Sequence, residues 1–180
     1  SSRGLGDVYK RQYYNNTKHD SPMILTASKN AKNSMLVSQD PNNEGSVMLY
    51  RSDNKSGIEF SYSLWFVIEN MEYKFGEWKH MFHKGNKTSY PNRAPGVFIH
   101  PDKNALRIYM NTMKSPNEYL DVDDIPIQKW ICIGIAVKQN KLDVYIKGNI
   151  IKSKTFSSPV KQNYGDVYVT NQGGFDGYIS

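Results

Sequence analysis

The sequence WICIGIAVKQNKLDVYIKGNIIKS, residues 130–153, decides the fold. Successive side chains of a strand point to opposite faces. Residues 130–137 would then place Ile or Val on one face and Trp, Cys, Gly and Ala on the other. A strand that is apolar on both faces is typical of the middle of a sheet. The turn sequences Gln139-Asn140 and Lys147-Gly148-Asn149 follow, so the segment predicts an antiparallel meander of three strands.

Two earlier segments show the same two-residue period. In IEFSYSLWFVI, residues 58–68, every even-numbered position is a large and mostly apolar side chain, which predicts a strand with one buried face. GVFIHPDKNALRIYMN, residues 96–111, predicts a hairpin whose turn is Pro-Asp-Lys-Asn at 101–104. Helical periodicity of useful length is absent. The pattern predicts an all-β protein in which antiparallel strands form a sandwich or a barrel.

Five motifs in a fixed order point to a family. The matching positions are Trp65, Trp78 to Gly85, Trp130, the Leu142-Tyr145-Gly148 hairpin, and Phe175-Gly177-Ile179 in the final GGFDGYIS. In this order they resemble the laminin-G-like, concanavalin-A-type jelly roll of lectins and glucanases, over residues 47–180. The resemblance implies a two-sheet antiparallel sandwich that is extracellular and binds glycans or proteins rather than catalysing a reaction.

The same resemblance carries two further expectations. It implies that Trp65, Trp78 and Trp130 occupy core positions, so we favour packing over ligand stacking for these three rings. It also implies a closing strand that continues past the "G-x-I" of the last motif. The sequence stops at Ser180, so we expect a jelly roll that is truncated at its closing strand.

The first twelve residues, SSRGLGDVYKRQ, differ from the rest of the chain, which is dense in Lys, Asn, Ile and Tyr. Residues 2–12 resemble the in-frame translation of a sequencing-library adapter. We interpret residues 1–12 as a non-native scar on an environmental sequence, and residues 13–180 as one domain. No run approaches the ~20 apolar residues of a membrane span, so we expect no membrane insertion of this segment. The single cysteine, Cys132, lies in an apolar run and is expected to be a buried thiol.

The net charge of +6 raises the question of nucleic-acid binding. Binding to phosphates requires a clustered basic patch. The lysines are instead spread along the chain, often at strand ends and turns, as at Lys55, Lys103, Lys141 and Lys147. We therefore expect no nucleic-acid partner.

The acidic segment EYLDVDD, residues 118–124, contains carboxylates that could serve in catalysis or bind a metal. A retaining glycosidase needs two carboxylates about 5–5.5 Å apart on one face. Asp121 and Asp123 share a face, but Glu118 would point to the other side. We favour solvated carboxylates at a strand end, and predict that the protein is not an enzyme and requires no cofactor. Asp121 and Asp123 remain candidates for calcium, which prefers such oxygen ligands and which some members of the family carry. His80 and His83 are three residues apart, so we expect them on opposite faces, unable to share a metal.

Four aromatic residues lie in polar, loop-like contexts: Tyr73, Phe75, Tyr90 and Tyr119. Exposed rings of this kind can stack on sugars, although they can also fold back onto the sandwich. We name them as the candidate carbohydrate-binding residues. Sequons begin at Asn15, Asn54 and Asn86, which fits a secreted protein but also arises by chance in an Asn-rich chain.

The sequence therefore predicts a non-catalytic binding or adhesion module for a carbohydrate or a surface protein. Its expected place is extracellular or on the surface of a virion. A structural jelly roll of a large-virus particle, without a small ligand, is the alternative. A domain derived from a glycoside hydrolase is a more distant one.

Overall fold

The computed structural model describes residues 22–49 and 58–180, and these contain twelve β-strands and no α-helix. The strands are β1 (Lys29–Asn30), β2 (Met35–Val37), β3 (Glu59–Asn70), β4 (Lys79–Gly85), β5 (Arg93–Ile99), β6 (Leu106–Met110), β7 (Glu118–Val122), β8 (Ile131–Lys138), β9 (Lys141–Ile146), β10 (Asn149–Thr155), β11 (Asp166–Val169) and β12 (Asp176–Ile179). Within the described ranges, nothing has the helical length and apolar character of a membrane span.

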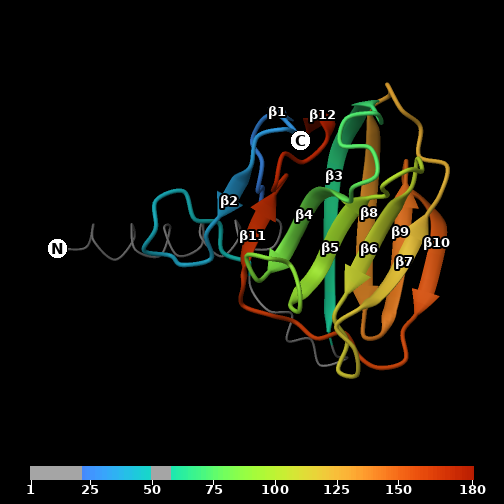
Figure 1. Cartoon of the computed structure of the whole chain (residues 1–180). Helices are drawn as coiled ribbons and strands as arrows, with labels where there is room; N and C mark the ends of the chain where they lie inside the picture. The colour runs from blue at the N-terminus through green and yellow to red at the C-terminus, as the bar shows by residue number, and fades with distance from the viewer. Residues whose placement is uncertain (1–21, 50–57) are drawn as a thin grey trace.

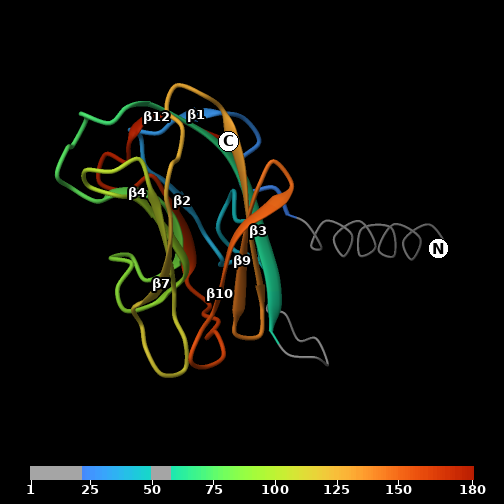
Figure 2. The same cartoon turned by 90° about the vertical axis from the view of Figure 1, so that its right-hand side faces the viewer.

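The strands form two six-stranded sheets (Figure 1). Sheet A has the order β1-β12-β3-β8-β9-β10, and sheet B has the order β2-β11-β4-β5-β6-β7. All pairings between these strands are antiparallel. Figure 2 shows the two sheets edge-on as two packed layers. The predicted all-β, two-sheet sandwich is therefore confirmed.

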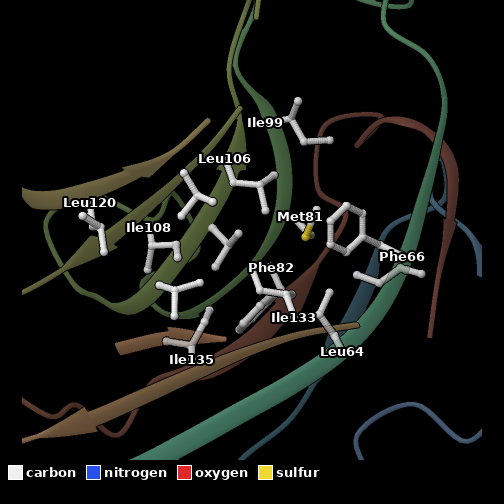
Figure 3. Packing of buried hydrophobic residues seen from close by; sticks show 14 of the residues in the cluster. Leu64, Phe66, Met81, Phe82, Ile99, Leu106, Ile108, Leu120, Ile133 and Ile135 are labelled. Atoms are coloured by element: carbon white, nitrogen blue, oxygen red, sulfur yellow. The ribbon is translucent and has the colours of Figure 1, made fainter. Parts of the chain in front are cut away.

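The core lies between the sheets. Figure 3 shows Leu64 and Phe66 of β3, with Ile133 of β8, on the same side of the core as one another, and Ile108 and Leu120 of sheet B across from them. All five are buried. Removing this apolar surface from water is the main stabilising contribution, at ~25 cal/mol per Å².

The sequence patterns predicted this part of the fold correctly. The even-numbered residues of β3 from Phe60 to Ile68 face the core, and β8 lies in the middle of sheet A, between β3 and β9. The meander β8-β9-β10 turns at the two predicted positions. The hairpin β5-β6 also forms, and the segment 101–104 joins its two strands.

The prediction for the three tryptophans is wrong. Trp65, Trp78 and Trp130 are 52%, 37% and 44% exposed. Trp65 pairs with Cys132. Their sequence neighbours Phe66 and Ile131 point into the core, so Trp65 and Cys132 point to the outer face of sheet A. Trp130 precedes the buried Ile131 and so falls on that outer side as well. Cys132 is for the same reason partly exposed rather than buried.

β12 lies between β1 and β3 in sheet A. It pairs with the second half of β3, and Ser180 and Trp65 exchange two backbone hydrogen bonds of 2.8 and 2.9 Å. The motif glycine Gly177 allows this close approach, because a Cβ there would lie 1.8 Å from the carbonyl oxygen of Val67. The interpretation of residues 1–12, and the sequons at Asn15 and Asn54, lie outside the described residues. Asn86 is in the loop after β4.

Candidate functional site

A row of side chains crosses the outer face of sheet B. The strand register places Tyr168 opposite His83, His83 opposite Gly96, Gly96 opposite Tyr109, and Tyr109 opposite Tyr119. These residues therefore share one face of five neighbouring strands. The residues between them in sequence, such as Val97, Ile108 and Leu120, form the buried inner row. The first row consequently faces away from the core.

A second row lies parallel to the first. It runs from His80 through Phe98 and Arg107 to Asp121. Trp78 packs against this row, and Arg93 packs against the first. We call this set the aromatic face; its members are Trp78, His80, His83, Arg93, Phe98, Arg107, Tyr109, Tyr119, Asp121 and Tyr168.

The rings of the aromatic face support one another. The ring centroids of Phe98 and Tyr109 are 5.7 Å apart, and those of Tyr109 and Tyr119 are 5.9 Å apart. His83 stacks on Tyr168 at 4.9 Å with an interplanar angle of 10°. Edge-to-face and stacked pairs at these distances are favourable beyond the area that they bury. The rings are thus held in fixed orientations.

Arg107 is neutralised within the face. Its Nε donates to Oδ1 of Asp121 at 2.8 Å, and its Nη2 donates to Oδ2 at 3.0 Å. Its guanidinium carbon also lies 3.8 Å from the ring centroid of Tyr119 and 4.7 Å from that of Trp78. The hydrogen bonds from Arg107 hold the pKa of Asp121 below its usual range. Asp121 is therefore a carboxylate committed to one partner.

Arg93 is held over the neighbouring tyrosine without such a partner. Its guanidinium carbon is 3.6 Å from the ring centroid of Tyr109. Gly96 leaves the room for it, since a Cβ at Gly96 would lie 3.1 Å from Cδ of Arg93. Its Nη1 donates to the hydroxyl of Ser89 at 3.1 Å, and its Nη2 donates to Oδ1 of Asn117 at 3.0 Å. Burial lowers the pKa of this guanidinium.

The prediction that His80 and His83 face opposite sides is wrong. A β-bulge places three residues of β4 against two of β5, so both histidines point to the outer face. Nε2 of His80 is 2.6 Å from Nδ1 of His83.

The hydrogen bonds around this pair assign the tautomers. The backbone N–H of Asn171 donates to Nδ1 of His80 at 2.8 Å, so the proton of His80 is on Nε2 and is donated to His83. His83 then carries its proton on Nε2 and donates to the carbonyl of Asn86. Both rings are neutral, and burial lowers the pKa of His80 to about 3 and also lowers that of His83. The pair ties the loop after β11 to the loop after β4.

The four predicted sugar-binding residues lie in different places. Tyr119 belongs to the aromatic face and is 39% exposed. Tyr90 is exposed in the loop between β4 and β5, and Phe75 is exposed in the loop between β3 and β4. Figure 2 shows both loops extending beyond the outer face of sheet B. Tyr73 folds back, because its hydroxyl donates to the carbonyl of Gly173 at 2.9 Å.

The two calcium candidates, Asp121 and Asp123, lie in different surroundings. Asp121 is paired with Arg107, whereas Asp123 lies beyond β7 and lines a surface cavity of about 470 Å³. Lys129 and Lys152 line the same cavity and bring positive charge to it. Residues 22–49 and 58–180 contain no group of three or more His, Cys, Asp or Glu side chains placed to hold a metal ion.

Most of the aromatic face was not predicted from the sequence as a binding site. Phe98, Arg107 and Tyr109 are the outward positions of the predicted hairpin, and their period was visible. Aromatic and arginine side chains at outward positions of adjacent strands were the available signal. Arg93 left no such signal, because its position depends on Gly96 and on the pairing of β5 with β6.

Comparison with known proteins extends only to the fold. No family model matches the sequence. No curated protein matches it either. Among solved structures, the chain is similar to the binding domain of botulinum neurotoxin serotype D, with a TM-score of 0.53 and 14% identity over 82% of this chain. The match covers 41% of that neurotoxin chain, so this chain spans about two fifths of its length.

Two carbohydrate-binding modules resemble the chain less closely. One, from Bacillus subtilis, has a TM-score of 0.44 and 10% identity over 68% of this chain and 71% of its own. The other, from a Ruminococcus gnavus sialidase bound to α2,3-sialyllactose, has a TM-score of 0.47 and 8% identity over 67% and 73%. At these identities the likeness concerns the β-sandwich fold alone.

Proposed function

We propose that this protein is a non-catalytic binding module whose aromatic face recognises a carbohydrate. The observation that carries the proposal is the pair of side-chain rows across sheet B, in which aromatic rings lie side by side and two guanidinium groups stack on tyrosines. These rows lie on the outer face of sheet B, away from the apolar core between the sheets.

The chemistry of the face suits a sugar. A ring presents a flat apolar surface that matches the C–H face of a pyranose, while hydroxyls and guanidinium groups at its edge match the sugar hydroxyls. Trp78 and Tyr119 are partly exposed, so they offer surface for stacking. Because neighbouring side chains already hold these rings, binding costs little additional side-chain entropy.

The carboxylates support a role without catalysis. A glycosidase needs a general acid whose pKa is raised. Hydrogen bonds from Arg107 lower the pKa of Asp121 instead. Partial burial raises the pKa of Glu118, but hydrogen bonds from Thr112 and Ser157 outweigh this and hold it below the usual value. The two residues also lie on opposite faces of β7, as the sequence predicts.

The finer assignment is to the laminin-G-like, concanavalin-A-type jelly roll, in an extracellular protein or on the surface of a virion. The order of the five sequence motifs supports it. A surface protein is the other class of ligand that this resemblance implies.

A glycan array probed with the full chain tests the proposal. We expect binding to at least one saccharide class, with a loss of tenfold or more in affinity for Trp78→Ala and for Tyr119→Ala. Trp65→Ala is the matched control, because Trp65 is an exposed tryptophan on the outer face of sheet A. Absence of any bound glycan would favour the structural jelly roll, and equal losses for the control would place the site elsewhere.

A further inference from the structure

We propose that the carbohydrate bound by the aromatic face is acidic, and that Arg93 pairs with its carboxylate or sulfate group. This inference rests on the proposed function and names the class of ligand. It is carried by the charge and the hydrogen bonds of one buried side chain.

The charge of Arg93 has no counter-ion among the described residues. The side chain is 9% exposed, and Ser89 and Asn117, the side chains to which it donates hydrogen bonds, are both neutral. Among residues 22–49 and 58–180, no carboxylate oxygen lies within 4.0 Å of its nitrogens. A guanidinium stays protonated in proteins, so the site holds a permanent buried cation. Such a charge is costly unless it is paired.

The donors of Arg93 are also incompletely used. A guanidinium has five N–H donors in a fixed fork. Two of them bond to Ser89 and Asn117. The Nε–H is buried and has no acceptor in the described part of the chain. An oxyanion with two oxygens in one plane can accept from such a fork in a bidentate manner.

Arg107 shows within the same face what Arg93 lacks. Both guanidinium groups stack on a tyrosine, at 3.6 Å for Arg93 on Tyr109 and 3.8 Å for Arg107 on Tyr119. Arg107 has a bidentate carboxylate in Asp121. Arg93 has the same stacking without the acid. A ligand carboxylate or sulfate would complete the second site in the way that Asp121 completes the first.

The surroundings of Arg93 are suited to a sugar. Tyr90, in the loop that leads into β5, is exposed, and Tyr119 lies opposite Tyr109, the ring on which Arg93 stacks. Burial lowers the pKa of the nearby His83, which favours the neutral form of that ring. An anionic group is therefore drawn to Arg93 without competition from a neighbouring acid.

The test compares acidic saccharides with their neutral counterparts on the unchanged full chain. The probes are uronic-acid oligosaccharides and their carboxyl-reduced forms, sulfated oligosaccharides and their desulfated forms, and α2,3-sialyllactose and lactose. We expect one acidic member to bind at least tenfold more tightly than its neutral form, and the pair that shows this distinguishes carboxylate from sulfate. The affinity should also fall as salt rises.

A variant then assigns the effect to Arg93. Arg93→Met should remove the preference for the acidic form, and Arg93→Lys should restore only part of it, since an ammonium lacks the fork. Lys138→Met, which removes one charge at the end of β8 in sheet A, is the control. Equal affinity for acidic and neutral forms of a bound saccharide overturns this inference and leaves the proposed function standing. Failure of every saccharide to bind overturns both. Because the ligand comparison uses the wild-type chain, it remains decisive if Arg93→Met does not fold.

Discussion

The two outer faces of the sandwich are built by the same alternation and carry different chemistry. In the middle of sheet A, Ser63 pairs with Gly134, and Ser61 pairs with Ala136. In the middle of sheet B, the equivalent positions hold rings, histidines and guanidinium groups. Trp65 and Trp130 of sheet A have no ring or cation contact with another described residue.

The difference separates fold from function. A solvent-facing sheet can carry small residues, as sheet A does at Ser61, Ser63, Gly134 and Ala136, and still support the core. The network on sheet B is therefore more than the fold requires. It holds large side chains in fixed orientations at a surface where the fold does not require this. Fixed side chains lose little conformational entropy when a ligand binds.

The largest expected difference between the two faces is a dependence of stability on pH, which comes from the buried histidines of sheet B. The pKa of His80 falls from 6.5 to about 3 on folding, so the unfolded chain binds more protons between these values and stability is lost as the pH falls through that window. We expect a loss of roughly 2 kcal/mol in the free energy of unfolding between pH 7.5 and pH 4.5. The acids Asp121 and Glu118 titrate below their usual values, which keeps most of their effect outside this range.

Urea unfolding at the two pH values measures this loss. His80→Gln, which keeps a polar side chain and removes the ionisation, should flatten the dependence on pH. A wild-type free energy of unfolding that is the same at both pH values would contradict the buried neutral pair.

The second prediction compares the two arginines by stability. Arg107→Met leaves the Asp121 carboxylate without its bidentate partner, so we expect a cost of about 1–2 kcal/mol. Arg93→Met leaves no charge behind and removes an uncompensated one, so the loss of stacking is offset and the net change should stay below about 1 kcal/mol. Chemical denaturation of both variants gives the order. A larger cost for Arg93→Met would mean that Arg93 already has its counter-ion.

The smallest effect is expected on the outer face of sheet A. Trp130 is half-exposed, so Trp130→Ala should cost about 1 kcal/mol, well below the roughly 3–5 kcal/mol of a fully buried aromatic residue. Phe66→Ala in the core is the matched reference and should show the larger value. Thermal melts of the two variants settle the ranking, and similar midpoints would return Trp130 to the core.

The sequence allowed the sandwich, its core faces and three of its turns to be predicted, because a two-residue period and the residue types of a turn are local properties. The tryptophans were misplaced because the family motif was given more weight than the two-residue period of the strands. That period alone puts Trp65 on the other face of its strand from Phe66, and Trp130 on the other face from Ile131. The histidine pair was missed for another reason. The bulge at Met81 depends on the pairing of β4 with β5, which no local pattern specifies.

The candidate site was predicted only in part. Tyr119 was named from its polar context, and it belongs to the aromatic face. Arg93 and Arg107 were not named, since their importance lies in which tyrosine and which acid the register brings beside them. Cross-strand contacts of this kind join residues that are far apart in the sequence. Arg107 and Asp121 are 14 residues apart, and the Arg93 backbone and Asn111 are 18 residues apart.

The most direct test of the central claim is to map the bound saccharide on the two faces by NMR. The full chain is titrated with the highest-affinity saccharide from the array, and the backbone and ring shifts are followed. We expect the perturbed resonances to cluster at Arg93, Phe98, Tyr109 and Tyr119 of sheet B, while those of Ser63, Trp65 and Gly134 in sheet A stay unchanged. Perturbations that centre on sheet A, with the aromatic face unaffected, would contradict it.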